Sequence, residues 1–318
     1  MERSIALDCH THLAPIVPDL LRAIPDVDWR EAELKLMAGS VQLAGGPKVT
    51  RPEALLAWMD ENGIRRAWYS VPPPMYRDGI ADEAAARAWC GYVNQALRVI
   101  GAPHAARLSP SFLLPVRHPA LAAEIAAACA QHGAHFAMAA GHAASAVMLS
   151  DPTYDALWSA LDSAQAFVLL HPTTGSDPRL DRFFLHNLIG GPGETALAAA
   201  HLAMGRVIER FPRIRFILSH GGGSAALAAG RIARGQAVGR PGADTGAPPM
   251  TQAFRHFMVD CIAHSAAGLS LVADVFGRDR LLFGSDWPFS MGLTDPWSQL
   301  DGVDPEVMAA IAKADPEA

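Results

Sequence analysis

The sequence predicts an α/β fold, a (β/α)8 TIM barrel, and three observations support this prediction. Short apolar runs of strand type alternate with alanine-rich helical patterns along the chain, which is typical of parallel βα units. The chain has 318 residues, a length that an α/β barrel commonly uses as one domain. No GxGxxG or P-loop motif follows the first strand, so a nucleotide-binding doubly wound sheet is poorly supported.

Eight apolar runs are predicted as the strands of the barrel. The first covers residues 5–7 and leads directly into a polar run. Pro72 closes the second run, because proline cannot donate to a sheet ladder. The other runs cover residues 64–71, 108–116, 133–140, 166–170, 214–218, 257–261 and 281–284.

Helical patterns separate these strands. Pro52 opens the first predicted helix and Gly63 ends it, because proline suits the first turn and glycine the position after the last. The remaining predicted helices cover residues 82–100, 119–132, 153–163, 194–210, 225–236, 268–276 and 305–314.

Residues 13–50 stand apart from this alternation, as an irregular segment that is rich in proline and glycine near both ends. The segment is too long for an ordinary βα loop, so we expect it to fold over a site as a lid or wall. The predicted organisation is therefore a single barrel domain over residues 1–318 with a lid-like insertion at about 13–50.

Composition excludes several classes of protein. The net charge is −6 and basic residues are scattered, so the chain lacks the basic patch of a nucleic-acid-binding protein. Four dispersed cysteines without CxxC spacing indicate free thiols in a reducing compartment. No secretory signal pattern and no apolar stretch of roughly 18 residues is found. We therefore expect a cytoplasmic protein with neither a membrane nor a nucleic-acid partner.

Metal-binding residue types follow four of the predicted strands. His10 and His12 come directly after the first strand, and alternation along a strand points both imidazoles to one face. His171, His220 and Asp286 follow the fifth, sixth and eighth strands. Active sites of such barrels lie at the carboxyl ends of the strands, and imidazole and carboxylate are zinc ligands. The pattern favours a metal site there over chance placement.

These residues lie in motifs that resemble those of the amidohydrolase superfamily, in particular its decarboxylase-like branch. The resemblance runs from residue 5 to about 290 and implies a barrel of the metal-dependent hydrolase type. The motifs are DCHTH at 8–12, LLHP at 169–172, ETALAAAHLAMGRVIERFPRIRFILSHGGG at 194–223 and FGSDWPF at 283–289.

The resemblance implies the roles of the site residues. His10, His12, His171 and Asp286 would hold one divalent metal ion, zinc or alternatively manganese. His220 would be the catalytic acid/base that acts on the metal-bound water, together with Asp286. Two-metal members of the superfamily carry a bridging Lys or Glu on the fourth strand, whereas residues 133–140 read GAHFAMAA. This difference indicates a single metal.

Substrate contacts are also implied. In the decarboxylase-like branch, an arginine eleven residues after the sixth-strand histidine reaches into the neighbouring subunit's site and holds a substrate carboxylate. Arg231 has this spacing, which implies a homodimer and a small-molecule carboxylate substrate; a solvated helix residue is the alternative. His264, Tyr76 and Trp287 are further candidates for the pocket, with loop or core packing as the competing interpretation.

The resulting functional prediction is a metal-dependent decarboxylase, a carbon–carbon lyase that acts on an unsaturated or aromatic carboxylic acid. A hydrolase of lactonase or amidase type, or a hydratase, would use the same residues, because variable loops choose the substrate. A non-catalytic metal-binding barrel is the alternative from a different class.

Overall fold

A ring of parallel strands forms the centre of the computed structural model, which describes residues 4–141, 148–173 and 177–318. The ring contains β1 (Ile5–His12), β5 (Ile64–Ser70), β6 (Leu108–Pro110), β7 (Phe112–Leu114), β8 (His135–Ala139), β9 (Phe167–His171), β10 (Arg215–Leu218), β11 (Met258–Asp260) and β12 (Leu281–Leu282). One run of pairing joins β1, β5 and β6, and a second joins β7 to β12 in chain order.

Backbone hydrogen bonds connect these two runs into a barrel. Ser111 separates β6 from β7, which together are the predicted third strand, and its N–H donates to Tyr69 O at 2.8 Å. At the other junction, Cys9 N donates to Phe283 O at 2.9 Å and Asp286 N donates to His10 O at 2.8 Å. The predicted (β/α)8 barrel is therefore confirmed.

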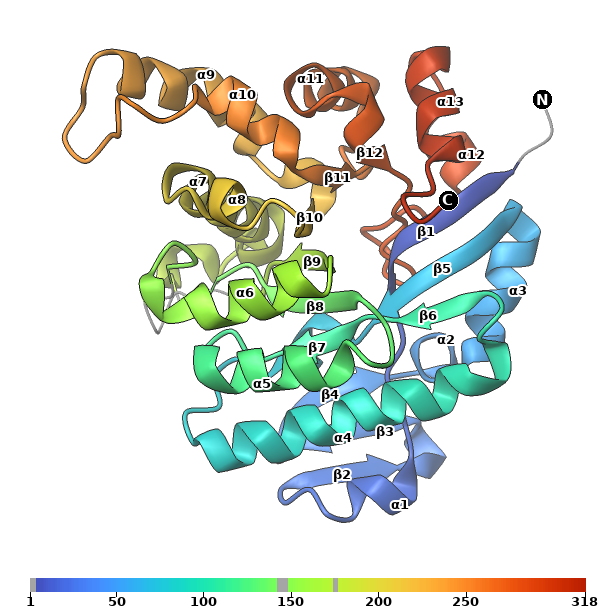
Figure 1. Cartoon of the computed structure of the whole chain (residues 1–318). Coiled ribbons are helices and arrows are strands. Elements are labelled where there is room, and N and C mark those ends of the chain that lie inside the picture. Colours follow the sequence, from blue (N-terminus) through green and yellow to red (C-terminus); the bar gives the residue numbers. More distant parts are fainter. Residues whose placement is uncertain (1–3, 142–147, 174–176) are drawn as a thin grey trace.

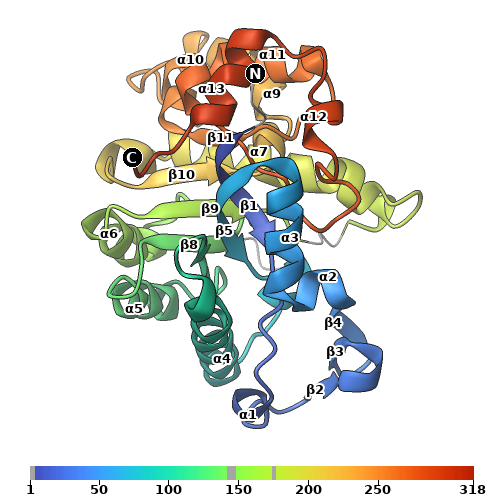
Figure 2. The same cartoon turned by 90° about the vertical axis from the view of Figure 1, so that its right-hand side faces the viewer.

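Helices surround the ring on its outer side, as Figures 1 and 2 show. They are α3 (Pro52–Asn62), α4 (Glu83–Gly101), α5 (Pro119–Cys129), α6 (Asp155–Ser163), α7 (Gly191–Met204), α8 (Val207–Arg210), α9 (Ala225–Ala237), α11 (Ala266–Phe276) and α13 (Pro305–Lys313). The helix predicted over residues 194–210 is split into α7 and α8, because Arg206 takes a left-handed φ of 58° between them.

The segment predicted as irregular contains a small antiparallel sheet. Its strands are β2 (Val27–Arg30), β3 (Lys35–Ala38) and β4 (Val41–Gly45), with α1 (Pro18–Leu21) before them and α2 (Pro47–Thr50) after them. Figure 2 shows this sheet projecting from the barrel. The expectation of irregular structure was wrong, because strands of four or five residues are too short to show a clear alternation.

The hydrophobic core fills the ring and the layer between strands and helices. All eight residues of β1 are buried, which explains why this strand carries polar side chains only where they meet other polar groups. Among the described residues, no helix is both long and apolar enough to cross a membrane.

The last residues of the chain cover the amino-terminal end of the barrel. Arg66 of β5 pairs with Asp315 at 2.6 Å and with Glu317 at 3.1 Å. Glu317 also accepts a hydrogen bond from His135 Nε2 at 2.9 Å. This bond from His135 is the main reason why the pKa of Glu317 lies below its usual value. The tail therefore ties β5 to β8.

Candidate active site

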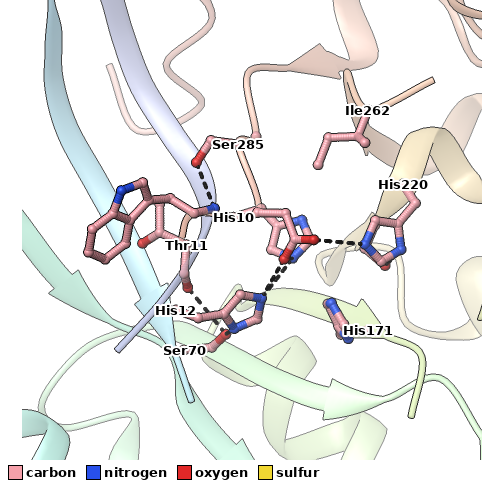
Figure 3. A network of polar contacts seen from close by, with 12 residues as sticks. His10, Thr11, His12, Ser70, His171, His220, Ile262 and Ser285 are labelled. Atoms are coloured by element: carbon pink, nitrogen blue, oxygen red, sulfur yellow. Dashed lines mark hydrogen bonds and ion pairs between the residues drawn. The ribbon is translucent and has the colours of Figure 1, made fainter. Parts of the chain in front are cut away.

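The carboxyl ends of the strands bring four imidazoles and one carboxylate together. His10 and His12 end β1, His171 ends β9, His220 follows β10, and Asp286 follows β12. Figure 3 shows the four histidines pointing toward one another. This convergence of residues from four strands is the central feature of the site.

The histidines of β1 meet at their Nε2 atoms, which lie 3.1 Å apart. The register against β5 shifts between Asp8 and Thr11, as in a β-bulge, and such bulges re-aim side chains near functional sites. His10 Nδ1 donates to Asp260 Oδ2 at 2.8 Å, and His12 Nδ1 donates to Val71 O at 2.9 Å.

His171 has the same arrangement, because its Nδ1 donates to Pro172 O at 2.8 Å while its buried Nε2 has no hydrogen-bond partner. Burial holds the pKa of His171 well below its usual value, so the imidazole is neutral. With the proton on Nδ1, the lone pair lies on Nε2. Each of the three imidazoles thus turns an electron pair toward the same point.

Asp286 supplies the negative charge of the cluster. Its Oδ1 lies 3.0 Å from His12 Nε2 and 3.5 Å from His10 Nε2. Burial opposes ionisation of the carboxyl, but the neighbouring His12 and His220 hold its pKa well below the usual range. The residue has a φ of 57°, a left-handed conformation that costs about 1 kcal/mol and is typical of functional sites.

These residues fit a divalent metal ion. The Nδ1 atoms of His10, His12 and His171 each hydrogen-bond to an oxygen, so their Nε2 atoms are the ones that meet the Asp286 carboxylate. One ligand atom each from His10, His171, His220 and Asp286 lies within 4.8 Å of the others, and His12 Nε2 adjoins two of them. Imidazole nitrogen and carboxylate oxygen are the donors that zinc accepts.

His220 stands at the edge of the cluster on a tight turn. Its Nε2 lies 3.6 Å from Asp286 Oδ2, and its side chain is 22% exposed, whereas the side chains of His10 and His12 are fully buried. His220 and the three glycines after it all have positive φ. A Cβ at Gly223 would lie 2.2 Å from Pro192 O, so the turn requires glycine there.

Asp260, at the end of β11, is a site residue that the sequence analysis missed. It is fully buried and accepts hydrogen bonds from His10 Nδ1 and from the backbone N–H groups of His220, Gly221 and Ile262. An acidic residue at the end of the apolar run 257–261 was the available signal. Burial opposes its ionisation, but the hydrogen bond from His10 keeps its pKa below the usual value.

A cavity of about 650 Å³ opens in front of the cluster. His171, His220, Asp286 and His264 are among the residues that line it. Apolar side chains make up much of the remainder, including Phe184, Leu188, Ile262, Leu271, Phe289 and Met291.

The other predicted substrate contacts are not among the residues that line this cavity. Tyr76 is buried with its ring 6.1 Å from that of His171, and Trp287 is buried with its ring 6.2 Å from that of Trp58. Arg231 lies on α9, where it is exposed. Its partner-subunit role stays a prediction.

Comparison with known proteins agrees with this geometry. A family model described as amidohydrolase matches residues 7–316. The 2-amino-3-carboxymuconate-6-semialdehyde decarboxylase of Dictyostelium discoideum is 29% identical over 159 residues, which are 49% of this chain and only 44% of that relative. The gamma-resorcylate decarboxylase of Polaromonas sp. strain JS666 is 25% identical over 309 residues, covering 91% of this chain and 89% of the relative.

Solved structures share the fold. A dihydroxybenzoic acid decarboxylase from Polaromonas sp. JS666, with bound manganese and the inhibitor 2-nitroresorcinol, superposes with a TM-score of 0.75 at 20% identity. The superposition covers 98% of this chain and 95% of that one.

Proposed function

The chain belongs to the amidohydrolase family, and we propose that it is a metal-dependent decarboxylase of an unsaturated or aromatic carboxylic acid. The observation that carries this proposal is the convergence of three histidine Nε2 atoms and the Asp286 carboxylate beside a cavity that His171 and Asp286 help to line. The two relatives compared above are decarboxylases by name, which supports the same reaction class.

His10, His12, His171 and Asp286 would hold one metal ion per chain, and the donor set suits zinc. Manganese is the alternative, since it is the ion bound in the Polaromonas structure. When bound, the ion supplies Lewis-acid polarisation of the substrate's oxygen atoms. All four proposed ligands are buried, so little water would screen the attraction between the metal ion and the Asp286 carboxylate.

His220 is the proposed acid/base, because it is the most exposed member of the cluster and lines the cavity. The imidazolium would donate its Nε2 proton to the substrate carbon that carries the carboxylate. The bond between that carbon and the carboxylate carbon then breaks, CO2 leaves, and the new C–H bond takes its place. A proton taken up from the solvent restores the imidazolium of His220, so the overall change is a carboxylate plus one proton giving the C–H product plus CO2, without an oxidant or reductant.

Residues 13–50 are proposed as a wall or lid of this site. Residues 42–49 line a second cavity, together with Pro74 and Phe289. These same two residues also line the main cavity. The two cavities therefore share part of their lining, which supports a position of residues 42–49 beside the site.

A homodimer with Arg231 in the partner's site belongs to the same proposal. Leu227 lines the cavity, and Arg231 lies one turn further along α9 with its side chain exposed. A guanidinium suits bidentate binding of a carboxylate, which would complete recognition of a small acid substrate.

The test is a panel of unsaturated and aromatic carboxylic acids scored for CO2 release, with lactones, amides and hydratable alkenes in parallel. His220→Asn should keep its metal and lose activity by about 10²–10⁴-fold, the usual contribution of general acid–base catalysis. His264→Asn is the control for a change of cavity shape, since His264 lies on the wall outside the cluster. Hydrolysis or hydration without CO2 release would contradict the proposed reaction.

A further inference from the structure

Asp260 joins two parts of the site that are far apart in the sequence. Its Oδ2 accepts from His10 Nδ1 and from His220 N, both at 2.8 Å. Its Oδ1 accepts from Gly221 N at 2.7 Å and from Ile262 N at 3.1 Å. One buried carboxylate therefore satisfies four donors.

We propose that Asp260 is a positioning residue that fixes His10 in its metal-binding form and holds the backbone turn that carries His220. This inference rests on the metal site of the proposed function. Asp260 does not line the cavity, so it acts through the two histidines rather than on the substrate.

The first role follows from the tautomer of His10. An ionised carboxylate has no proton to donate, so the bond between Asp260 Oδ2 and His10 Nδ1 requires the proton of a neutral His10 to lie on Nδ1. The lone pair then stays on Nε2, the atom that meets His12. A carboxylate bonded to a ligand imidazole also makes it more basic and orients its ring.

The second role follows from the backbone of the turn. His220 and Gly221 have φ values of 56° and 62°, a left-handed pair that aims successive N–H groups at one anion. These N–H groups are inside the protein, where an unpaired donor is costly. Asp260 thus stabilises the strained turn and with it the position of the His220 imidazole.

Close packing leaves Asp260 little freedom to move. A Cβ at Gly284 would lie 2.7 Å from the Asp260 Cβ and 3.0 Å from the His10 Cβ. Asn has nearly the same shape as Asp, so Asp260→Asn changes the hydrogen bonding with little change in volume.

The effect of Asp260→Asn depends on how the amide orients. With its NH2 toward Gly221 and Ile262, two buried backbone donors would lose their acceptor. With its NH2 toward His10 and His220, only one backbone donor, His220 N, would lose its acceptor, so this orientation is favoured. Nδ1 of His10 must then accept, which moves its proton to Nε2 and blocks the metal-binding lone pair.

The experiment measures metal affinity and the tautomer directly. In metal-free protein labelled with ¹⁵N-histidine, NMR should show His10 protonated on Nδ1 in the wild type and on Nε2 in Asp260→Asn, with His10→Gln identifying the signal. The dissociation constant for Zn²⁺, measured by chelator competition, should rise about 10–100-fold in Asp260→Asn. At saturating metal, kcat should still fall more than KM changes, because the His220 turn is loosened.

Asp162→Asn is the matched control. Asp162 is a largely buried carboxylate that accepts from Arg213 N at 2.8 Å and pairs with the Arg213 guanidinium, and it lines neither cavity. Its substitution should lower stability without changing Zn²⁺ affinity. Unchanged affinity in folded Asp260→Asn, or Nε2-protonated His10 in the wild type, would overturn the inference. The NMR and metal readouts stand even if no acid in the panel is decarboxylated.

Discussion

Removal of the metal is expected to lower the thermal stability of this protein, because a bound ion would hold together the imidazole nitrogens and the carboxylate that the site gathers. His10 Nε2 and His12 Nε2 lie 3.1 Å apart, and His12 Nε2 lies 3.0 Å from Asp286 Oδ1. An ion that binds only the folded state stabilises it by about 2.7 kcal/mol at 100 times its dissociation constant. At about 2 °C per kcal/mol for a chain of this length, the melting temperature should fall by roughly 5 °C.

The assay is thermal unfolding of chelator-treated protein, measured before and after Zn²⁺ or Mn²⁺ is added back. His171→Ala removes a buried ligand whose Nε2 has no other partner, so this variant should lose the response to metal. His264→Ala changes a cavity residue outside the cluster and should keep it. The reasoning is refuted if verified metal removal leaves the wild-type melting temperature unchanged, or if His171→Ala responds as the wild type does.

Three further predictions concern composition, pH and assembly. Elemental analysis should find one divalent ion per wild-type chain and a loss of that ion in Asp286→Ala; two ions per active chain would contradict the ligand set. Because the pKa of Glu317 is lowered from 4.5, its bond to His135 stabilises the fold above about pH 4.5 and is lost as the pH falls through the folded-state value. Glu317→Gln should therefore cost about 1 kcal/mol in neutral urea unfolding and nothing at more acid pH. Mixing Arg231→Ala with His220→Asn should restore part of the activity if Arg231 serves the partner's site, and verified subunit exchange without recovery would place Arg231 outside that site.

The barrel could be predicted because most of its strands contain a short, mainly apolar run, and apolar runs are what a buried parallel sheet requires. The interruption of the third strand at Ser111 could not be predicted, because it involves a hydrogen bond from Ser111 N to Tyr69 O on the neighbouring strand. The sheet over residues 27–45 was missed for a different reason. Its strands are short and half-exposed, so their pattern does not differ from that of a loop.

The same limit applies within the site. His10, His12, His171, His220 and Asp286 could be found because each follows directly after an apolar run, and the barrel brings strand ends together. The fold alone does not say which neighbouring side chains reach the cavity. Which side chains reach the cavity depends on the conformations of the loops that follow the strands, and the pattern of apolar runs does not determine these.

Asp260 shows why spacing alone could not complete the site. Its partners His10 and His220 lie 250 and 40 residues away, and no local pattern links a carboxylate to donors at those distances. The turn at His220 departs from ordinary backbone preferences, since a left-handed histidine is unfavourable unless something holds it. His220, with its unfavourable backbone conformation, and Asp260, which the sequence analysis missed, are therefore linked by one set of hydrogen bonds. Such strain persists only where surrounding contacts over-determine it, and here those contacts are the hydrogen bonds to the buried Asp260 carboxylate.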